Sequence, residues 1–113
     1  MINIKYPPLS VNKVWQGRRF KTQLYEDYET ILLALLPKSE IPEGELQLVI
    51  NFHVYSKLAD LDNFLKPFID ILQKKYLFDD KRIKQIIATK KQSIKGQEVI
   101  EFKINPYVEV YNQ

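Results

Sequence analysis

The sequence contains no cysteine and only one histidine, His53. The absence of cysteine excludes a disulfide scaffold, a thiolate zinc site and a cysteine nucleophile. No apolar run approaches the roughly 20 residues that a membrane-spanning helix needs. The first residues also lack the basic segment, apolar stretch and small-residue cleavage site of a secretion signal. We therefore expect a cytoplasmic protein that does not enter a membrane.

The residues that are present suffice for one folded domain spanning 1–113. The chain has a mass of 13.4 kDa, with 45% hydrophobic and 12% aromatic residues. A chain of this size and composition buries enough surface for a single ordinary core, so global disorder is excluded.

Basic residues are concentrated in two acid-free stretches, although the net charge is only +3. They are Lys13, Arg18, Arg19 and Lys21 in the first, and Lys81, Arg82, Lys84, Lys90, Lys91 and Lys95 in the second. Such clustering favours a polyanionic partner such as DNA. The first stretch also carries Trp15 and Phe20, which could stack on an unpaired base. The alternatives are a surface loop whose rings anchor it to the core, and lysines that guard an edge strand.

Hydrophobic periodicity predicts an α+β domain with two helices on a small mixed sheet, in the order β-α-β-α-β-β. The expected elements are a strand over 2–6, an irregular segment to 21, a helix from a Thr22 N-cap to Pro37, a loop over 37–44, a strand over 46–54, a helix from near Asn63 to Lys75, and strands over 82–91 and 99–104. The last two strands are expected to form a β-hairpin around a turn at 93–96. Residues 105–113 are expected to form a tail or an extra edge strand. Pro67 fits the second helix only if that helix starts near Asn63 or is kinked.

Four aspartates form the first candidate for chemistry. Asp60 and Asp62 can point the same way in an extended loop, and a helix followed by a chain reversal can return Asp80, with its neighbour Asp79, beside them. Clustered carboxylates repel one another, and a divalent cation removes that repulsion. Oxygen ligands in an open site favour Mg²⁺, with Mn²⁺ as a possible substitute, and suit phosphodiester hydrolysis. The alternative is that these aspartates only cap a helix and form a turn.

Lys66 lies one helical turn after Asp62 and one turn before Asp70, so the three share a helix face. Lys66 could hold a scissile phosphate or stabilise charge in the transition state. It could equally form a solvated pair with Asp70. His53 points away from the apolar face of its strand and is a weak catalytic candidate. From the residues alone, a metal-dependent nuclease and a basic DNA-binding or partner-binding domain both remain open.

The motifs resemble those of the RusA family of Holliday junction resolvases, found in prophages and bacteria. The resemblance rests on Asp60-Leu61-Asp62-Asn63-x-x-Lys66-x-x-x-Asp70-x-Leu72 followed by Phe78-Asp79-Asp80. Pro7-Pro8-x-Ser10-x-Asn12 and Arg18-Arg19-Phe20-x-Thr22 are similar to that family too. The likeness covers about residues 4 to 104.

The resemblance implies a homodimeric, RusA-like crossover junction endodeoxyribonuclease that acts in DNA recombination and repair. It would use Mg²⁺ to nick four-way DNA junctions symmetrically, with no protein partner implied. The metal-binding acids would be Asp60, Asp62 and Asp80, and the essential lysine Lys66. Supporting roles would fall to Asn63, Asp70 and Asp79. We expect DNA-backbone contacts from Lys13, Arg18, Arg19, Lys21, Lys81, Arg82, Lys84, Lys90 and Lys91. The alternative is a non-catalytic branched-DNA-binding or architectural protein.

Overall fold

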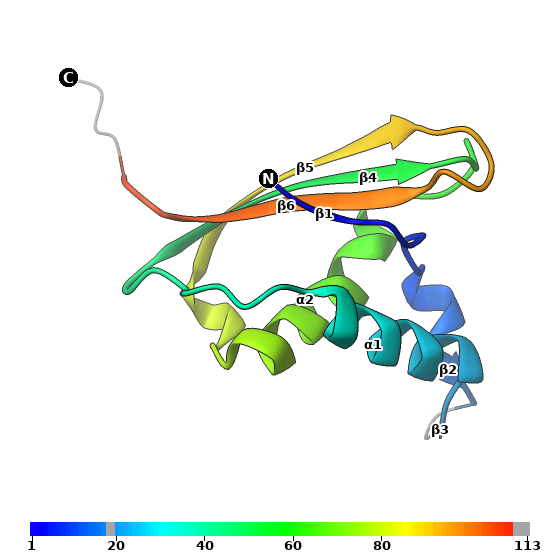
Figure 1. Ribbon diagram of the computed structural model, residues 1–113, viewed down its shortest axis with the longest axis horizontal. Helices are drawn as coiled ribbons and strands as arrows, with labels where there is room; N and C mark the ends of the chain where they lie inside the picture. The colour runs from blue at the N-terminus through cyan, green and yellow to red at the C-terminus, as the bar shows by residue number, and fades with distance from the viewer. Residues whose placement is uncertain (18–19, 110–113) are drawn as a thin grey trace.

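A computed structural model describes residues 1–17 and 20–109 as a sheet with two α-helices against one of its faces (Figure 1). The helices are α1 (Gln23–Leu35) and α2 (Asp62–Tyr76). The four-stranded sheet has the order β1-β6-β4-β5, from β1 (Ile2–Ile4), β6 (Val99–Pro106), β4 (Leu46–Val54) and β5 (Ile83–Gln92). The expected α+β class, with two helices and a mixed sheet, is confirmed. No helix within the described ranges is long and apolar enough to cross a membrane.

The predicted hairpin between the last two strands is wrong, because β4 lies between them. β5 pairs with β4 in parallel, and β6 pairs with β4 in the antiparallel sense on its other side. The chain passes over the end of β4 after β5, where the Ser93 N–H donates to the Val54 carbonyl at 2.8 Å. The physical reason is burial. β6 places Ile100 and Phe102 in the core, whereas β5 has no buried residue and takes the edge.

The segment expected to be irregular contains regular structure instead. A 3-10 helix, η1 (Val11–Lys13), is followed by a two-stranded pair, β2 (Trp15–Gln16) and β3 (Phe20–Lys21). Short strands such as these lack a detectable period, which is why the sequence pattern missed them. At the other end, β6 extends to Pro106 and residues 107–109 form no strand; the rest of the expected edge strand lies outside the described residues.

The helices begin and end at residues that explain their lengths. Thr22 is the N-cap of α1, as predicted, and its Oγ1 accepts a hydrogen bond from the Tyr25 N–H at 3.2 Å. Pro67 lies inside α2, which starts at Asp62, so the proline occupies the second turn. Leu77 ends α2 in the left-handed conformation, with φ of 55°. A further 3-10 helix, η2 (Asp80–Arg82), leads into β5.

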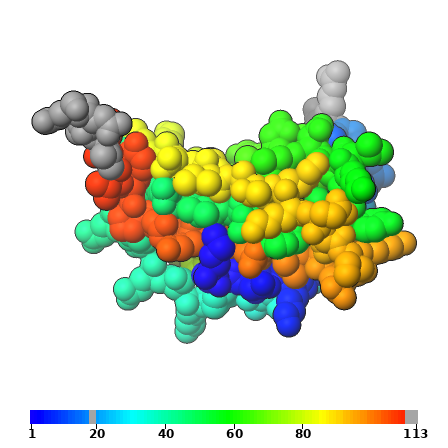
Figure 2. Space-filling model, turned by 90° about the horizontal axis from the view of Figure 1, so that it is seen from above, coloured from blue at the N-terminus to red at the C-terminus, as the bar shows by residue number. Residues whose placement is uncertain are grey.

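The core lies between the sheet and the two helices. β4 alternates along its whole length, and the five apolar side chains on one of its faces are buried: Leu46, Leu48, Ile50, Phe52 and Val54. Phe68 of α2 packs edge-on against Phe52 of β4 and Phe102 of β6, with ring centroids 6.2 and 5.3 Å apart. The opposite face of the sheet carries no helix, and Figure 2 shows this face with β5 in yellow and β6 in orange. Helix α2 packs its apolar side against the sheet and α1, and its polar side carries the charged residues of the candidate site.

Candidate active site

One side of α2 carries the candidate site. Asp62, Lys66 and Asp70 follow one another at four-residue spacing, so they share a helix face as predicted. Most of the residues between them, among them Phe68 and Ile69, are buried in the core that α2 shares with the sheet and α1. This separation of apolar and polar faces directs the charged side chains outward, and the Lys66 side chain is 64% exposed.

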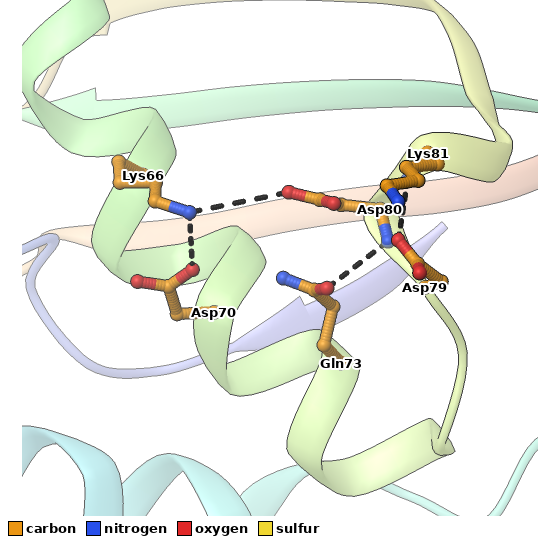
Figure 3. Close-up of polar contacts among 6 residues, drawn as sticks. All are labelled: Lys66, Asp70, Gln73, Asp79, Asp80 and Lys81. Carbon is orange, nitrogen blue, oxygen red and sulfur yellow. Dashed lines mark hydrogen bonds and ion pairs between the residues drawn. The ribbon is translucent and has the colours of Figure 1, made fainter.

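Lys66 lies between two carboxylates (Figure 3). Its Nζ is 2.8 Å from Asp70 Oδ1 and 3.9 Å from Asp80 Oδ2. The hydrogen bond to Asp70, followed by the charges of Asp70 and Asp80, raises the pKa of the Lys66 ammonium above its ordinary value. Lys66 is therefore a fixed cation at the point where α2 and the segment after it come together.

The two adjacent aspartates after α2 have different roles. The Asp79 side chain caps η2 by accepting a hydrogen bond from the Lys81 N–H at 2.9 Å, and this bond lowers the pKa of Asp79. The Asp80 N–H donates to Gln73 Oε1 at 3.0 Å, which holds its backbone against α2 (Figure 3). The cap-and-turn alternative is therefore correct for Asp79, while the Asp80 carboxylate faces Lys66.

Asp60 and Asp62 do not cap α2. The N-cap residue is Leu61, and no side chain accepts a hydrogen bond there; the Asp60 carbonyl accepts from the Asn63 N–H at 3.2 Å. Both aspartates are exposed. Asp62 leads the face that continues to Lys66, whereas Asp80 follows the opposite end of the helix. The structure thus brings Lys66, Asp70 and Asp80 together, with Asp60 and Asp62 at the start of α2.

The donor chemistry of these aspartates fits a hard divalent cation, because carboxylate oxygens are the ligands that Mg²⁺ prefers. Asp60 and Asp62 also have no hydrogen bond or ion pair from their carboxylates to another described residue. In the part of the chain that the structure describes, however, no three acidic or imidazole side chains are grouped around one point. Lys66 provides the positive charge beside Asp80 instead.

Several of the basic residues expected on DNA have partners within the chain. The Arg82 guanidinium donates to the Gly44 carbonyl at 2.9 Å and to the Pro42 carbonyl. Lys90 Nζ donates to the Ala59 carbonyl at 2.6 Å, and Lys84 pairs with Glu45 at 3.3 Å. Lys13, Lys21, Lys81 and Lys91 are exposed, and Arg18 and Arg19 lie outside the described residues.

The β2–β3 pair extends the site away from the sheet. Trp15 is 49% and Phe20 73% exposed, so these rings do not anchor the segment; the buried Val14 does. Lys21 Nζ lies 4.2 Å from the Tyr25 ring centroid. A hollow of about 130 Å³ separates Trp15 and Lys21 from Lys66 and Asp70. Exposed aromatic and basic groups therefore border the Lys66 face directly.

Sequence reasoning missed Gln73, although its seven-residue spacing from Lys66 on the same helix could have identified it. His53 lies outside the site. It pairs with Glu101 across β4 and β6, on the sheet face that the helices leave open. A catalytic role for His53 has no support in this arrangement.

The fold and site define a small α+β protein whose acidic and basic side chains line one helix beside the exposed β2–β3 pair. A comparison with protein-family models matches the model described as Endodeoxyribonuclease RusA over residues 10–104. The match covers most of the chain, and the chain belongs to the RusA endodeoxyribonuclease family, as the sequence motifs predicted. A search of curated proteins found no match.

Proposed function

We propose that this protein is a divalent-metal-dependent endonuclease that resolves four-way DNA junctions by paired nicks, in recombination and repair. Membership of an endodeoxyribonuclease family supports DNA cleavage as the reaction. The observation that carries the proposal is the Lys66 ammonium, held 2.8 Å from Asp70 and 3.9 Å from Asp80 on an exposed helix face. A cation that is already oriented can stabilise the negative charge that develops on the phosphate in the transition state.

Lys66 would act on the scissile phosphate. Its three N–H donors can contact a phosphate oxygen while Asp70 holds the ammonium in place, so the charge that develops in the transition state meets a cation that is already oriented. Asp70 is then a positioning residue and Gln73 positions Asp80 through its backbone. Asn63 follows Asp62 at the start of α2, where it can contact DNA.

Asp60, Asp62 and Asp80 are the residues that would hold Mg²⁺ or Mn²⁺. When bound, the ion supplies Lewis-acid polarisation of the phosphate and activation of water at neutral pH. The exposed carboxylates at the start of α2 leave room for substrate oxygens in the same site.

Branched DNA would be held by exposed groups around this face. Lys13 and Lys21 lie on the η1 and β3 segments, where they can contact backbone phosphates while Trp15 or Phe20 stacks on a base. We propose that Arg18 and Arg19, between β2 and β3, add to these contacts. A homodimer would present two such sites to a two-fold substrate.

A non-catalytic junction-binding protein is the second candidate. It is favoured by the finding that, among the described residues, no three acidic or imidazole groups surround one point, and that Lys66 already balances Asp80. In this case the aspartates would only shape the surface.

A labelled synthetic four-way junction separates the two candidates. We expect wild-type protein to make paired nicks with Mg²⁺ but not with EDTA, and the Asp62→Asn variant to bind the junction without cutting it. Tight binding with no cleavage in Mg²⁺ or Mn²⁺ would favour the non-catalytic candidate. Cleavage of flaps or single strands in preference to junctions would contradict the proposed substrate but support the proposed nuclease activity.

A further inference from the structure

A hollow beside the candidate site is lined by residues that the proposed chemistry uses only in part. It has a volume of about 400 Å³ and lies where residues 8–13, the connection from β4 to α2, and Glu98 meet. This volume is within the roughly 300–1,000 Å³ typical of pockets that bind small organic groups. Asp60 belongs to its lining, so a group bound there would lie next to the proposed active site.

The lining combines apolar side chains with amide groups. The half-buried Pro8 and Leu9 supply most of the apolar surface, because the Phe64 ring is only 4% exposed. Asn12 and Asn63 supply side-chain amides, which can both donate and accept hydrogen bonds. Apolar stacking surface together with such amides is the arrangement by which proteins hold an unpaired nucleobase.

The charges of the lining favour a base over a phosphate. Glu98 places a carboxylate on the cavity, and its negative charge repels a phosphate group. Lys13, which also borders the cavity, supplies the cation for the backbone attached to such a base. Since a carboxylate can only accept hydrogen bonds, Glu98 favours a base that presents an amino group.

We propose that this cavity receives one unpaired nucleobase of the DNA, adjacent to the phosphate that is cut, and that Asn12, Asn63 and Glu98 read its edge. This inference rests on the proposed function, because it places the base relative to the scissile phosphate. Unstacking costs least where base pairing is already interrupted, as at a branch point. The cavity therefore couples cutting to DNA whose bases can leave the stack.

Fluorescence of 2-aminopurine tests the base position without cleavage. The probe is placed in turn at each nucleotide that flanks the branch point of a four-way junction, and wild-type protein is added with Ca²⁺. We expect fluorescence to rise severalfold at one position, because the base leaves the stack. The Asn12→Phe variant, which fills the cavity, is expected to abolish the rise, and the comparison is made at protein concentrations that saturate the junction in a gel shift. Asn3→Phe places the same ring on β1 and is the control.

Base exchange tests Glu98. We expect wild-type protein to cut junctions with cytosine or adenine at that position about 5- to 10-fold faster than junctions with thymine, consistent with one edge contact. Glu98→Gln, whose amide can also donate to thymine, is expected to reduce this ratio to about twofold. Glu43→Gln removes an exposed acid elsewhere and should leave the ratio unchanged.

The outcomes separate the cavity from the nuclease. A fluorescence rise that Asn12→Phe abolishes, in a protein that never cleaves, supports the cavity and overturns the proposed reaction. Cleavage with no rise at any probe position, or a rise that Asn12→Phe leaves intact, overturns the cavity assignment and leaves the proposed nuclease activity standing. A base preference that Glu98→Gln does not change overturns the assignment of Glu98.

Discussion

At the scale of single residues, two neighbours in the sequence can have different roles, because the backbone directs their side chains to different partners. Asp79 uses its carboxylate to cap η2, while Asp80 turns its carboxylate toward Lys66. The motif Asp79-Asp80 shows two acids, but no sequence pattern states which of them faces the helix. In the same way, Asp60 and Asp62 look like helix caps in the sequence and cap nothing in the structure.

Lys66 gives the first prediction at this scale. Lys66→Met keeps the apolar stem and removes the ammonium, so we expect single-turnover cleavage of a four-way junction to fall about 100-fold. Junction affinity should change by less than about threefold, because one exposed charge contributes little to binding. Lys38→Met removes a lysine from the exposed loop after α1 and should cut normally. Equal losses of cleavage in both variants would contradict the role assigned to Lys66.

The His53–Glu101 pair gives a prediction on stability. The hydrogen bond and charge of His53 hold the pKa of Glu101 below its ordinary value of 4.5. The lowered pKa of Glu101 therefore contributes stability that is present above pH 4.5 and is lost as the pH falls through the lowered pKa. Because both side chains are partly exposed, we expect less than about 1 kcal/mol. Urea unfolding between pH 3 and 6 should show a smaller acid loss for Glu101→Gln than for wild type, and an unchanged loss for Glu43→Gln.

At the scale of elements, the sequence predicts whatever has a strong period and misses what depends on competition between strands. The alternation of β4 and the Thr22 cap of α1 were both readable. The partner of β6 was not, because it depends on β6 burying Ile100 and Phe102 better than β5 can bury its own residues. The candidate residues along α2 could be predicted from their types and spacing. The contact of Gln73 with Asp80 could not, because it depends on how the chain reverses at Leu77.

That reversal can be tested. Leu77 adopts φ of 55°, which strains a residue that has a Cβ, and its side chain is 87% exposed. Packing of the leucine side chain therefore offsets little of this strain. A residue with a Cβ loses roughly 1–2 kcal/mol there, and glycine loses about 0.5–1 kcal/mol in entropy on folding. We expect Leu77→Gly to raise the free energy of unfolding by about 0.5 kcal/mol in urea titrations. Leu77→Ala keeps the Cβ and should not be stabilised; a gain in that variant would point to exposure of leucine, not to backbone strain.

At the scale of the whole molecule, the basic side chains available to DNA are those without a carbonyl or carboxylate partner inside the protein. Arg82, Lys84 and Lys90 are bound to carbonyls or to Glu45, whereas Lys13 and Lys21 are exposed beside the α2 face. The net charge of +3 therefore understates how strongly one side of the protein can attract DNA.

Salt dependence tests this distribution. We expect junction affinity to fall steeply with salt, and the Lys13→Gln/Lys21→Gln variant to lower the slope of log K against log [salt] by about 0.9 for each DNA phosphate that the variant no longer neutralises. Gel-shift titrations at several salt concentrations give the slope. Lys38→Gln should leave it unchanged. A double variant with the wild-type slope would place the DNA on another face.

The bond from Lys90 to the Ala59 carbonyl has a consequence of its own. It links the edge strand β5 to Ala59, the residue just before Asp60. The Lys90 side chain therefore holds the loop that carries the Asp60 carboxylate. Neutralising Lys90 should slow DNA cleavage, because the loop before Asp60 would lose a hydrogen bond that holds it. The salt-dependent part of the DNA affinity should not change. Lys90, which the sequence suggests as a DNA contact, would then be a residue that positions the Asp60 carboxylate.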